Sequence, residues 1–462
     1  MNMAQTQALR ARTLTGLLPE TDPLSIRQAL ANAHPGVSSL CRYDQESLWE
    51  LDTRSLPKPL AQWRRQARDF AEERLRPLAR EMDQARPAGT PMPAELRALL
   101  TDAGRAGWLT DLLPRPFGTL PLTSTPWPLT WMQCLKVEEF ASACGGLMLL
   151  LCAHGLGVAP IVLSGDVNAI RRFVLPAYRQ NRRGQPHLFA YAITEPGAGS
   201  DAEEGHGARQ YRPGVVARKV AGGWRLNGRK CFISGGDIAD TLSVFAALEG
   251  EGMESWTCFV VRSDMSGFSP VRNELKMGMK ASSATELEFD DVFVPNHHVV
   301  GGLRRGWTLN RVTLNYSRLP VGAMGLGFAR RALEETIRQS HELRTGNQRL
   351  LDQQPVQMGI ARIMASLRSA RGLVWQGAQR FAPRQSEAAM AKFHASDVAV
   401  SACEQGMELL GPHALSGEGV IGKCFRDARL TQIFEGTNQI NQLGVVEDLQ
   451  SILTDPGQSP LF

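Results

Sequence analysis

The sequence predicts an α+β protein of several domains, in which a helical domain is followed by a β domain and then by a helical bundle. Two observations predict this order. Apolar residues recur at helical spacing in the first and last parts of the chain, whereas the middle part reads as paired strands without helices between them. A chain of 462 residues, 43% of them hydrophobic, is long enough for two or three such domains.

The expected boundaries follow these changes of period. We expect an N-terminal extension at residues 1–55, a helical domain at 56–186, a β domain at 187–300 and a C-terminal helical domain at 301–462. The extension carries no motif, although 25–31 and 45–51 have the composition of short helices.

The first helical domain begins near Leu60. Trp63, Ala67 and Phe70 start a stripe at spacings of three to five residues. Further helices are expected near residues 93–100, 129–143, 146–158 and 167–178. The very apolar stretch 145–163 contains His154, four glycines and Pro160, which favours a buried helix pair over a membrane span.

The middle domain shows strand patterns. Strands are expected at 215–220, 224–226, 230–234, 242–248, 257–261 and 285–293. The pair Asn227-Gly228 predicts a hairpin turn between the second and third of these. Because no helix intervenes, we expect an antiparallel barrel or sandwich.

The last domain returns to helical spacing. Leu326, Ala329, Leu333 and Ile337 mark one stripe. Six residues at alternating spacings of four and three mark a second, as in a bundle helix: Val356, Ile360, Ile363, Leu367, Ala370 and Val374. Segments 388–410 and 438–449 complete a bundle of four or more helices.

Composition narrows the functional class. The net charge is +5, and basic residues are dispersed as pairs such as Arg171-Arg172, so nucleic-acid binding is not favoured. Eight cysteines form no C-x-x-C pair, which suggests a reducing compartment and no metal site. We expect a cytoplasmic protein. Two arginines and no acid in the first eighteen residues leave a transit peptide, and hence the mitochondrial matrix, as the alternative.

Residues 191–201 read Y-A-I-T-E-P-G-A-G-S-D, a short strand followed by a turn with a bare backbone. Such a turn suits a large planar cofactor that carries a pyrophosphate. Gly197 to Ala202 also matches the dinucleotide pattern G-x-G-x-x-A, but that pattern requires a helix directly after it. Glycines and prolines follow instead, so a Rossmann site is excluded.

Two segments carry a family resemblance. Residues 191–201 closely resemble the flavin-site signature of the acyl-CoA dehydrogenases, and 426–445, R-D-A-R-L-T-Q-I-F-E-G-T-N-Q-I-N-Q-L-G-V, resemble the catalytic segment of that family. The resemblance extends from about Leu60 to Leu449. It implies the α, β, α domain order, FAD as cofactor, an acyl-CoA substrate, an electron-transfer flavoprotein as acceptor, and a homodimer or homotetramer.

The resemblance makes Glu435 the base that removes the α proton of the thioester while flavin N5 accepts the β hydride, giving the trans-2-enoyl-CoA. From the residues alone, Glu435 could equally be an exposed glutamate ahead of a helix capped by Thr437 or Asn438. Some relatives place the base just before the residue matching Arg318, where this chain has Ser317.

The remaining site residues are also implied by the resemblance. The cofactor-binding set is Tyr191, Ile193, Thr194, Ser200, Phe232, Ser234, Arg344, Thr345, Thr437 and Gln439. The substrate-binding set is Ser200, Arg318 and Gly436. Phe232 could instead be an ordinary core aromatic. Leu343 and Gly346 depart from the R-x-T-F-G motif that reaches the FAD of a neighbouring subunit, and Arg344 is the candidate substitute.

Two alternatives stay open from the sequence. An acyl-CoA oxidase reoxidised by O₂ would keep the same fold and base. A non-catalytic relative would use the basic surface and the N-terminal extension to bind nucleic acid or a protein partner. The length and branching of the acyl chain are not encoded in any motif.

Overall fold

The computed structural model describes residues 47–121, 128–200, 210–415 and 419–453. The chain forms two compact units, divided between Ala61 and Gln62. The described part of the first unit contains α4 (Leu48–Ser55), whose N-cap Ser47 accepts a hydrogen bond from the Glu50 amide. A helix was expected at 45–51; the one expected at 25–31 lies outside the described residues.

The helices that precede the sheet occupy the predicted region. α5 (Lys58–Phe70) continues into the π-helical turn η1 (Ala71–Leu75). The others are α6 (Ala94–Ala106), α7 (Leu129–Ala143), α8 (Gly145–Leu163), α9 (Val167–Ala169), η2 (Ile170–Val174) and α10 (Leu175–Arg182). The bounds of α7 match the predicted range 129–143, because no glycine or proline interrupts this segment.

α8 differs from the expected helix pair. It is one helix of 19 residues that continues through Pro160. Among the described residues it is the one helix long and apolar enough to cross a membrane, and 72% of the relevant window is buried inside the structure. It therefore behaves as the core helix of a folded domain, packing Val158 and Ile161 against Phe189 and Phe245 of the sheet.

The β domain is an eight-stranded sheet in the order β6-β7-β3-β2-β4-β5-β8, with β1 beside β4. Its strands are β1 (Phe189–Ala192), β2 (Val216–Val220), β3 (Gly223–Ser234), β4 (Thr241–Leu248), β5 (Thr257–Arg262), β6 (Phe268–Asn273), β7 (Ala284–Pro295) and β8 (Val299–Val300). Most pairings are antiparallel, as expected, but β1 and β2 both run parallel to β4. Leu226, Val244, Phe259 and Leu287 belong to the core of this domain.

The hairpin predicted at Asn227-Gly228 is wrong. β3 runs straight through both residues, and its register against β7 shifts between Leu226 and Gly228. The turn lies earlier, where Val220 of β2 pairs with Gly223. Glycine is needed at 228 for a different reason, because it has φ +130° and an added Cβ would lie 2.4 Å from a backbone oxygen. Glycine inside a strand commonly marks such a bulge.

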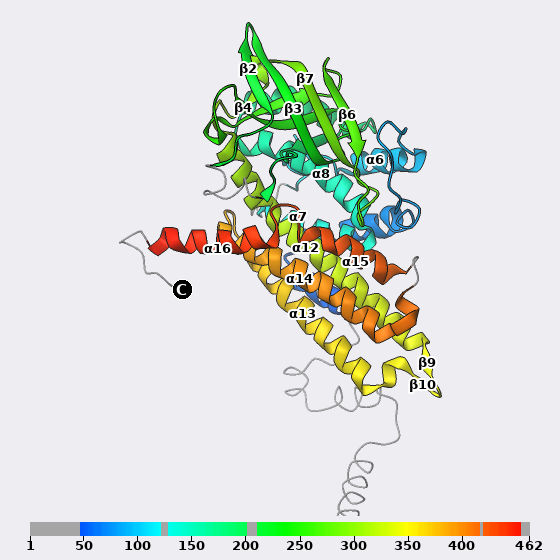
Figure 1. The fold of residues 1–462 in the computed structure, drawn as a ribbon. Coiled ribbons are helices and arrows are strands. Elements are labelled where there is room, and N and C mark those ends of the chain that lie inside the picture. Colours follow the sequence, from blue (N-terminus) through cyan, green and yellow to red (C-terminus); the bar gives the residue numbers. More distant parts are fainter. Residues whose placement is uncertain (1–46, 122–127, 201–209, 416–418, 454–462) are drawn as a thin grey trace, which may run out of the picture. The chain divides into compact units, whose positions relative to one another are not determined.

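The C-terminal helices are α12 (Gly306–Glu342), α13 (Gln354–Ala378), α14 (Gln385–Leu410), α15 (Val420–Thr431) and α16 (Asn438–Leu453), with a small hairpin of β9 (Arg344–Thr345) and β10 (Gln348–Arg349) after α12. All six residues of the predicted α13 stripe are buried. α15 was not predicted as a separate helix. The α, β, α fold class is confirmed (Figure 1).

Candidate active site

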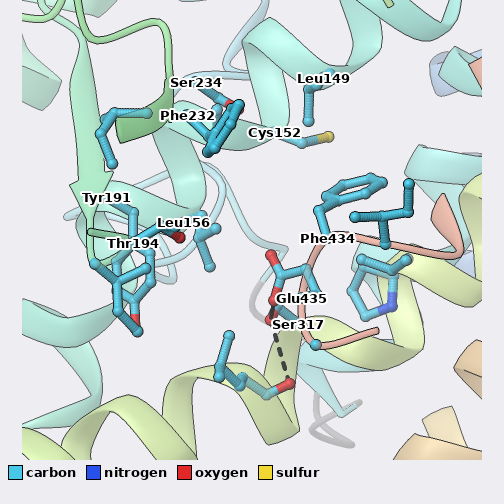
Figure 2. A pocket seen from close by; sticks show the side chains of 18 of the residues that line it. Leu149, Cys152, Leu156, Tyr191, Thr194, Phe232, Ser234, Ser317, Phe434 and Glu435 are labelled. Carbon is cyan, nitrogen blue, oxygen red and sulfur yellow. Dashed lines mark hydrogen bonds between the residues drawn. The ribbon is translucent and has the colours of Figure 1, made fainter. Parts of the chain in front are cut away.

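A cavity of about 540 Å³ lies between the β domain and the surrounding helices. The end of β1, the end of β3, α7, α8, α12 and the loop between α15 and α16 all line it. Figure 2 shows Tyr191 and Thr194 on one side of the cavity, and Phe434, Glu435 and Ser317 on the other. The two segments that the sequence singled out are thus brought to one place.

The loop after β1 is held by a buried ion pair. The Lys230 ammonium on β3 donates to Glu195 Oε1 at 2.7 Å and to the Ile193 carbonyl at 2.8 Å. The other carboxylate oxygen of Glu195 accepts from the Tyr211 hydroxyl and from the Gly214 amide. Burial alone would raise the pKa of Glu195, but the Lys230 charge and these hydrogen bonds hold that pKa below its usual value. Glu195 is therefore a structural carboxylate, and we name this cluster the Glu195 latch.

The residues that follow the latch face the cavity. Pro196, Gly197, Ala198, Gly199 and Ser200 all line it. Ser200 also reaches across the cavity edge, because its hydroxyl oxygen accepts a hydrogen bond from the Thr437 amide at 3.0 Å. The loop after β1 and the loop that carries Glu435 are therefore joined directly.

Glu435 lies in a left-handed backbone conformation, with φ +59°, and Gly436 follows with φ +80°. This conformation is rare for a residue with a side chain and is held by surrounding contacts. The Ser317 hydroxyl donates to Glu435 Oε2, and Arg318 Nε donates to the Glu435 carbonyl at 3.3 Å. Both donors come from neighbouring positions on α12. The alternative of a glutamate projecting freely into solvent does not fit these contacts.

A buried lysine completes the support of this loop. Lys392 of α14 donates to the Gly436 carbonyl at 2.7 Å and to the Asn438 side-chain oxygen at 2.9 Å. Thr437 caps α16, because its hydroxyl oxygen accepts from the Ile440 amide at 3.3 Å. Of the two caps considered from the sequence, Thr437 is therefore the one used. The strained turn at Glu435 is fixed from three helices.

Burial raises the pKa of Glu435 above its usual value, and the Ser317 hydrogen bond and the charges of Arg318 and Lys392 oppose this rise only in part. A carboxyl group in such surroundings can hold or release a proton closer to neutral pH than an exposed glutamate does. Glu435 is thus suited to general-base chemistry, whereas Glu195, with a lowered pKa and every oxygen engaged, is not.

Most of the sequence-predicted residues meet at the cavity. Those that line it are Tyr191, Ile193, Thr194, Ser200, Phe232, Ser234, Glu435 and Gly436. Phe232 is not a core aromatic, because 59% of it is exposed and it has φ +57°. Its ring forms part of the cavity wall (Figure 2).

Five predicted residues lie outside the lining. Thr437 is the cap of α16, and its contact with the cofactor stays a prediction. Gln439 is exposed on α16. Arg318 is buried beneath the Glu435 loop, a position that suits holding the loop; its contact with CoA stays a prediction. Arg344 and Thr345 form β9, beyond the far end of α12 (Figure 1). Their predicted contact with a cofactor would require a second copy of the chain and also stays a prediction.

Sequence reasoning missed the residues that position the others. Lys230, Lys392 and the hydroxyl role of Ser317 were not anticipated. A lysine in a strand or a bundle helix normally indicates a solvent-exposed position, so its pattern alone gives no signal. The fully buried side chains of Lys230 and Lys392 become explicable only once their partners are known.

Comparisons with known proteins agree along the chain. Models of the N-terminal, middle and C-terminal domains of acyl-CoA dehydrogenases match residues 59–180, 190–292 and 304–449. Cyclohexane-1-carbonyl-CoA dehydrogenase of Geobacter metallireducens is 30% identical over 83% of this chain and 95% of its own length. The caffeyl-CoA reductase-Etf complex subunit CarC of Acetobacterium woodii is 29% identical over 82% of this chain and 95% of its own length.

Solved structures give the same result. Butyryl-CoA dehydrogenase from Megasphaera elsdenii is similar with a TM-score of 0.76 and 28% identity, over 86% of this chain and 99% of that one. An acyl-CoA dehydrogenase complexed with FAD from Bacillus anthracis has a TM-score of 0.75 and 26% identity, over 87% of this chain and 70% of that one. Because the domain models cover most of the chain in the expected order and the fold agrees, this chain belongs to the acyl-CoA dehydrogenase family of flavoprotein oxidoreductases.

Proposed function

We propose that this protein is an FAD-dependent dehydrogenase that oxidises an acyl-CoA thioester between its α and β carbons, with Glu435 as the base. One observation carries the proposal. The Glu435 carboxyl, with a raised pKa, faces a cavity whose opposite wall is the loop predicted to bind flavin (Figure 2). A base and a hydride acceptor on opposite sides of a substrate are what this oxidation requires.

The residues present fit an FAD molecule. Phe232 is 59% exposed and Ile433 55% exposed, and both line the cavity. Large apolar side chains left open in a cavity mark a surface that a planar apolar ligand can cover. Residues of the β1 end and of β3 would hold the ring: Tyr191, Ile193, Thr194, Phe232 and Ser234. The bare backbone at Gly197–Gly199 and the Ser200 hydroxyl suit a pyrophosphate. When bound, FAD supplies the acceptor for the β-hydrogen, which leaves as hydride.

The chain itself supplies the proton acceptor and its orientation. Ser317 holds Glu435 Oε2, which leaves Oε1 to receive the α proton as the α C–H bond breaks and the new C=C bond forms. The backbone N–H of Glu435 donates to no acceptor in the described part of the chain and can therefore donate to the thioester oxygen. A donor at that position stabilises the negative charge that develops on the oxygen.

We further propose that an electron-transfer flavoprotein receives the electrons. The Acetobacterium woodii relative is named as a subunit of an Etf complex, which supports this acceptor. An assembly in which Arg344 and Thr345 contact the cofactor of a neighbouring copy is part of the same proposal, since both residues are exposed at the end of the bundle.

The decisive experiment compares Glu435→Gln with the wild-type protein. Both should bind FAD with the same stoichiometry, because the change keeps shape and removes only the charge. We expect turnover of acyl-CoA thioesters with a dye acceptor, without oxygen, to fall by roughly 10²–10⁴-fold in the variant. Glu404→Gln, on the exposed face of α14, is the matched control and should keep full activity. Retention of most activity by Glu435→Gln would refute the assignment.

A further inference from the structure

One wall of the cavity carries polar groups that the proposed reaction does not use. Gln133 and Lys136, three residues apart on α7, both line the cavity, and their exposed fractions are only 5% and 3%. Tyr316 lines it from α12. The rest of the helical wall is mostly apolar, with Leu112, Val137 and Leu156 among its residues. We call Gln133, Lys136 and Tyr316 the polar end of the cavity.

Two of the three side chains contact Asp111. Lys136 Nζ donates to Asp111 Oδ2 at 2.6 Å, and Gln133 Nε2 donates to the Asp111 carbonyl at 3.1 Å. Tyr316 joins them because it lines the same cavity. Among the described residues none of the three is hydrogen-bonded to Glu435, whose carboxyl is held by Ser317.

Hydrogen-bonding capacity is left over at this site. An ammonium group has three donors, and within the described part of the chain Lys136 uses one of them, on Asp111. Because the amide nitrogen of Gln133 is engaged, its oxygen is the free end, and no described residue donates to it. No described residue bonds the Tyr316 hydroxyl either. Groups with spare hydrogen-bonding capacity that face a cavity can bind a polar group of a ligand that enters it.

The charge of the polar end indicates which ligand. Lys136 and Asp111 form a pair with side chains 4% exposed, so their charges cancel. Burial lowers the pKa of His154 to about 3 and raises that of Cys152 to about 11, so both are neutral at physiological pH. A carboxylate would therefore enter a site without net charge and meet Asp111 beside Lys136. An uncharged hydroxyl meets no such repulsion. It can accept from Lys136 or Tyr316 and donate to Gln133.

Resting on the function proposed above, we propose that the preferred acyl group carries an uncharged hydroxyl remote from the thioester, and that Gln133, Lys136 and Tyr316 bind it. A site built to hydrogen-bond a hydroxyl discriminates against the analogue that lacks it, since the buried groups of the site are then left unpaired. The cavity would thus select an oxygenated acyl chain over a hydrocarbon chain of the same length.

The test uses the FAD-loaded full-length protein and three matched series of acyl-CoA thioesters. At each chain length the far end carries hydrogen, a hydroxyl or a carboxylate. We expect kcat/KM for the best hydroxylated substrate to exceed that of its hydrocarbon match by roughly 10–100-fold. Tyr316→Phe and Gln133→Leu should each reduce this ratio by roughly 10-fold, since each removes one hydrogen-bonding group. Binding of the corresponding enoyl-CoA products, followed by calorimetry, should show the same change of preference.

Tyr178→Phe is the matched control, because Tyr178 is a buried tyrosine that does not line the cavity, and it should leave the ratio unchanged. Three outcomes overturn the inference alone: faster turnover of hydrocarbon substrates at every length, preference for the carboxylated series, or an unchanged ratio in both cavity variants. If the FAD-loaded protein oxidises none of the thioesters, the proposed function fails, and the inference fails with it.

Discussion

Ser317→Ala tests whether the Ser317 hydroxyl lowers the pKa of the proposed base, Glu435. In the structure this hydroxyl donates to Glu435 Oε2 and lowers the pKa of that carboxyl, against burial, which raises it. The proposed base, Glu435, acts in its deprotonated form, so we expect kcat to rise with pH through the pKa of Glu435 in the substrate complex. Removing the donor stabilises the protonated form, and the acidic limb of the kcat profile should move to higher pH.

The size of the shift follows from the strength of one hydrogen bond. A hydrogen bond to a charged group contributes about 1.5–3 kcal/mol, and one pKa unit corresponds to about 1.4 kcal/mol. Since water replaces part of the lost bond, we expect a shift of about one unit. At pH values on the acidic side of the profile, kcat of the variant should be roughly 10-fold lower than that of the wild-type protein, and at higher pH the loss should be much smaller.

The assay is dye-linked turnover of one saturating substrate across a pH range, with FAD content measured for each sample. Ser317→Thr keeps a hydroxyl at this position and should retain the wild-type profile. An acidic limb that stays in place in Ser317→Ala, or that moves to lower pH, would refute the argument that this hydroxyl tunes the base. A uniform loss at every pH would mean that Ser317 only supports the shape of the site.

Three further predictions concern stability and are checked by chemical denaturation. Glu195→Gln should cost about 3–5 kcal/mol, because it leaves the buried Lys230 ammonium without its counter-charge; a loss below about 1 kcal/mol would contradict the latch. Glu435→Gln should instead stabilise the protein at pH values above the raised pKa of Glu435, because the buried carboxylate carries a desolvation penalty that the amide avoids. This gain in stability should vanish at pH values below the pKa of an unfolded glutamate. A gain that does not depend on pH would refute this cause. Gly228→Ala should destabilise the protein by at least about 1–3 kcal/mol, because of the positive φ at this position and because the added Cβ would lie 2.4 Å from a backbone oxygen. The control Gly372→Ala, in a helix with open space around it, should stabilise the protein by about 0.5–1 kcal/mol. Equal effects at both positions would contradict the assigned bulge.

The sequence predicted the large-scale order of the protein well, because helical and strand periods change sharply where the domains change. The buried stripe of α13 is an example, since each of its residues faces the core as its spacing requires. Local geometry was harder to predict. The pair Asn227-Gly228 has the composition of a tight turn, but pairing of β3 with β7 on both sides of it stabilises a continuous strand. Tertiary contacts outweighed the local preference.

The candidate site shows the same division. Glu435 and the loop after β1 were found from motifs, since their residue types stand in a recognisable order. The donors that hold these two loops were not predicted, because each lies far from its partner in the sequence. Ser317 is 118 positions from Glu435, and Lys230 is 35 positions from Glu195. Such pairs depend on how whole elements pack.

The Glu195 latch has a consequence for how the holoprotein forms. Every bond in it, from Lys230, Tyr211 and two backbone amides, joins two groups of the polypeptide. We therefore expect the turn that would face the pyrophosphate to keep its shape in the cofactor-free protein, so that capture of the cofactor does not require folding of its binding site. A chain stripped of its prosthetic group should then regain it by simple association, at a rate that rises in proportion to the concentration supplied.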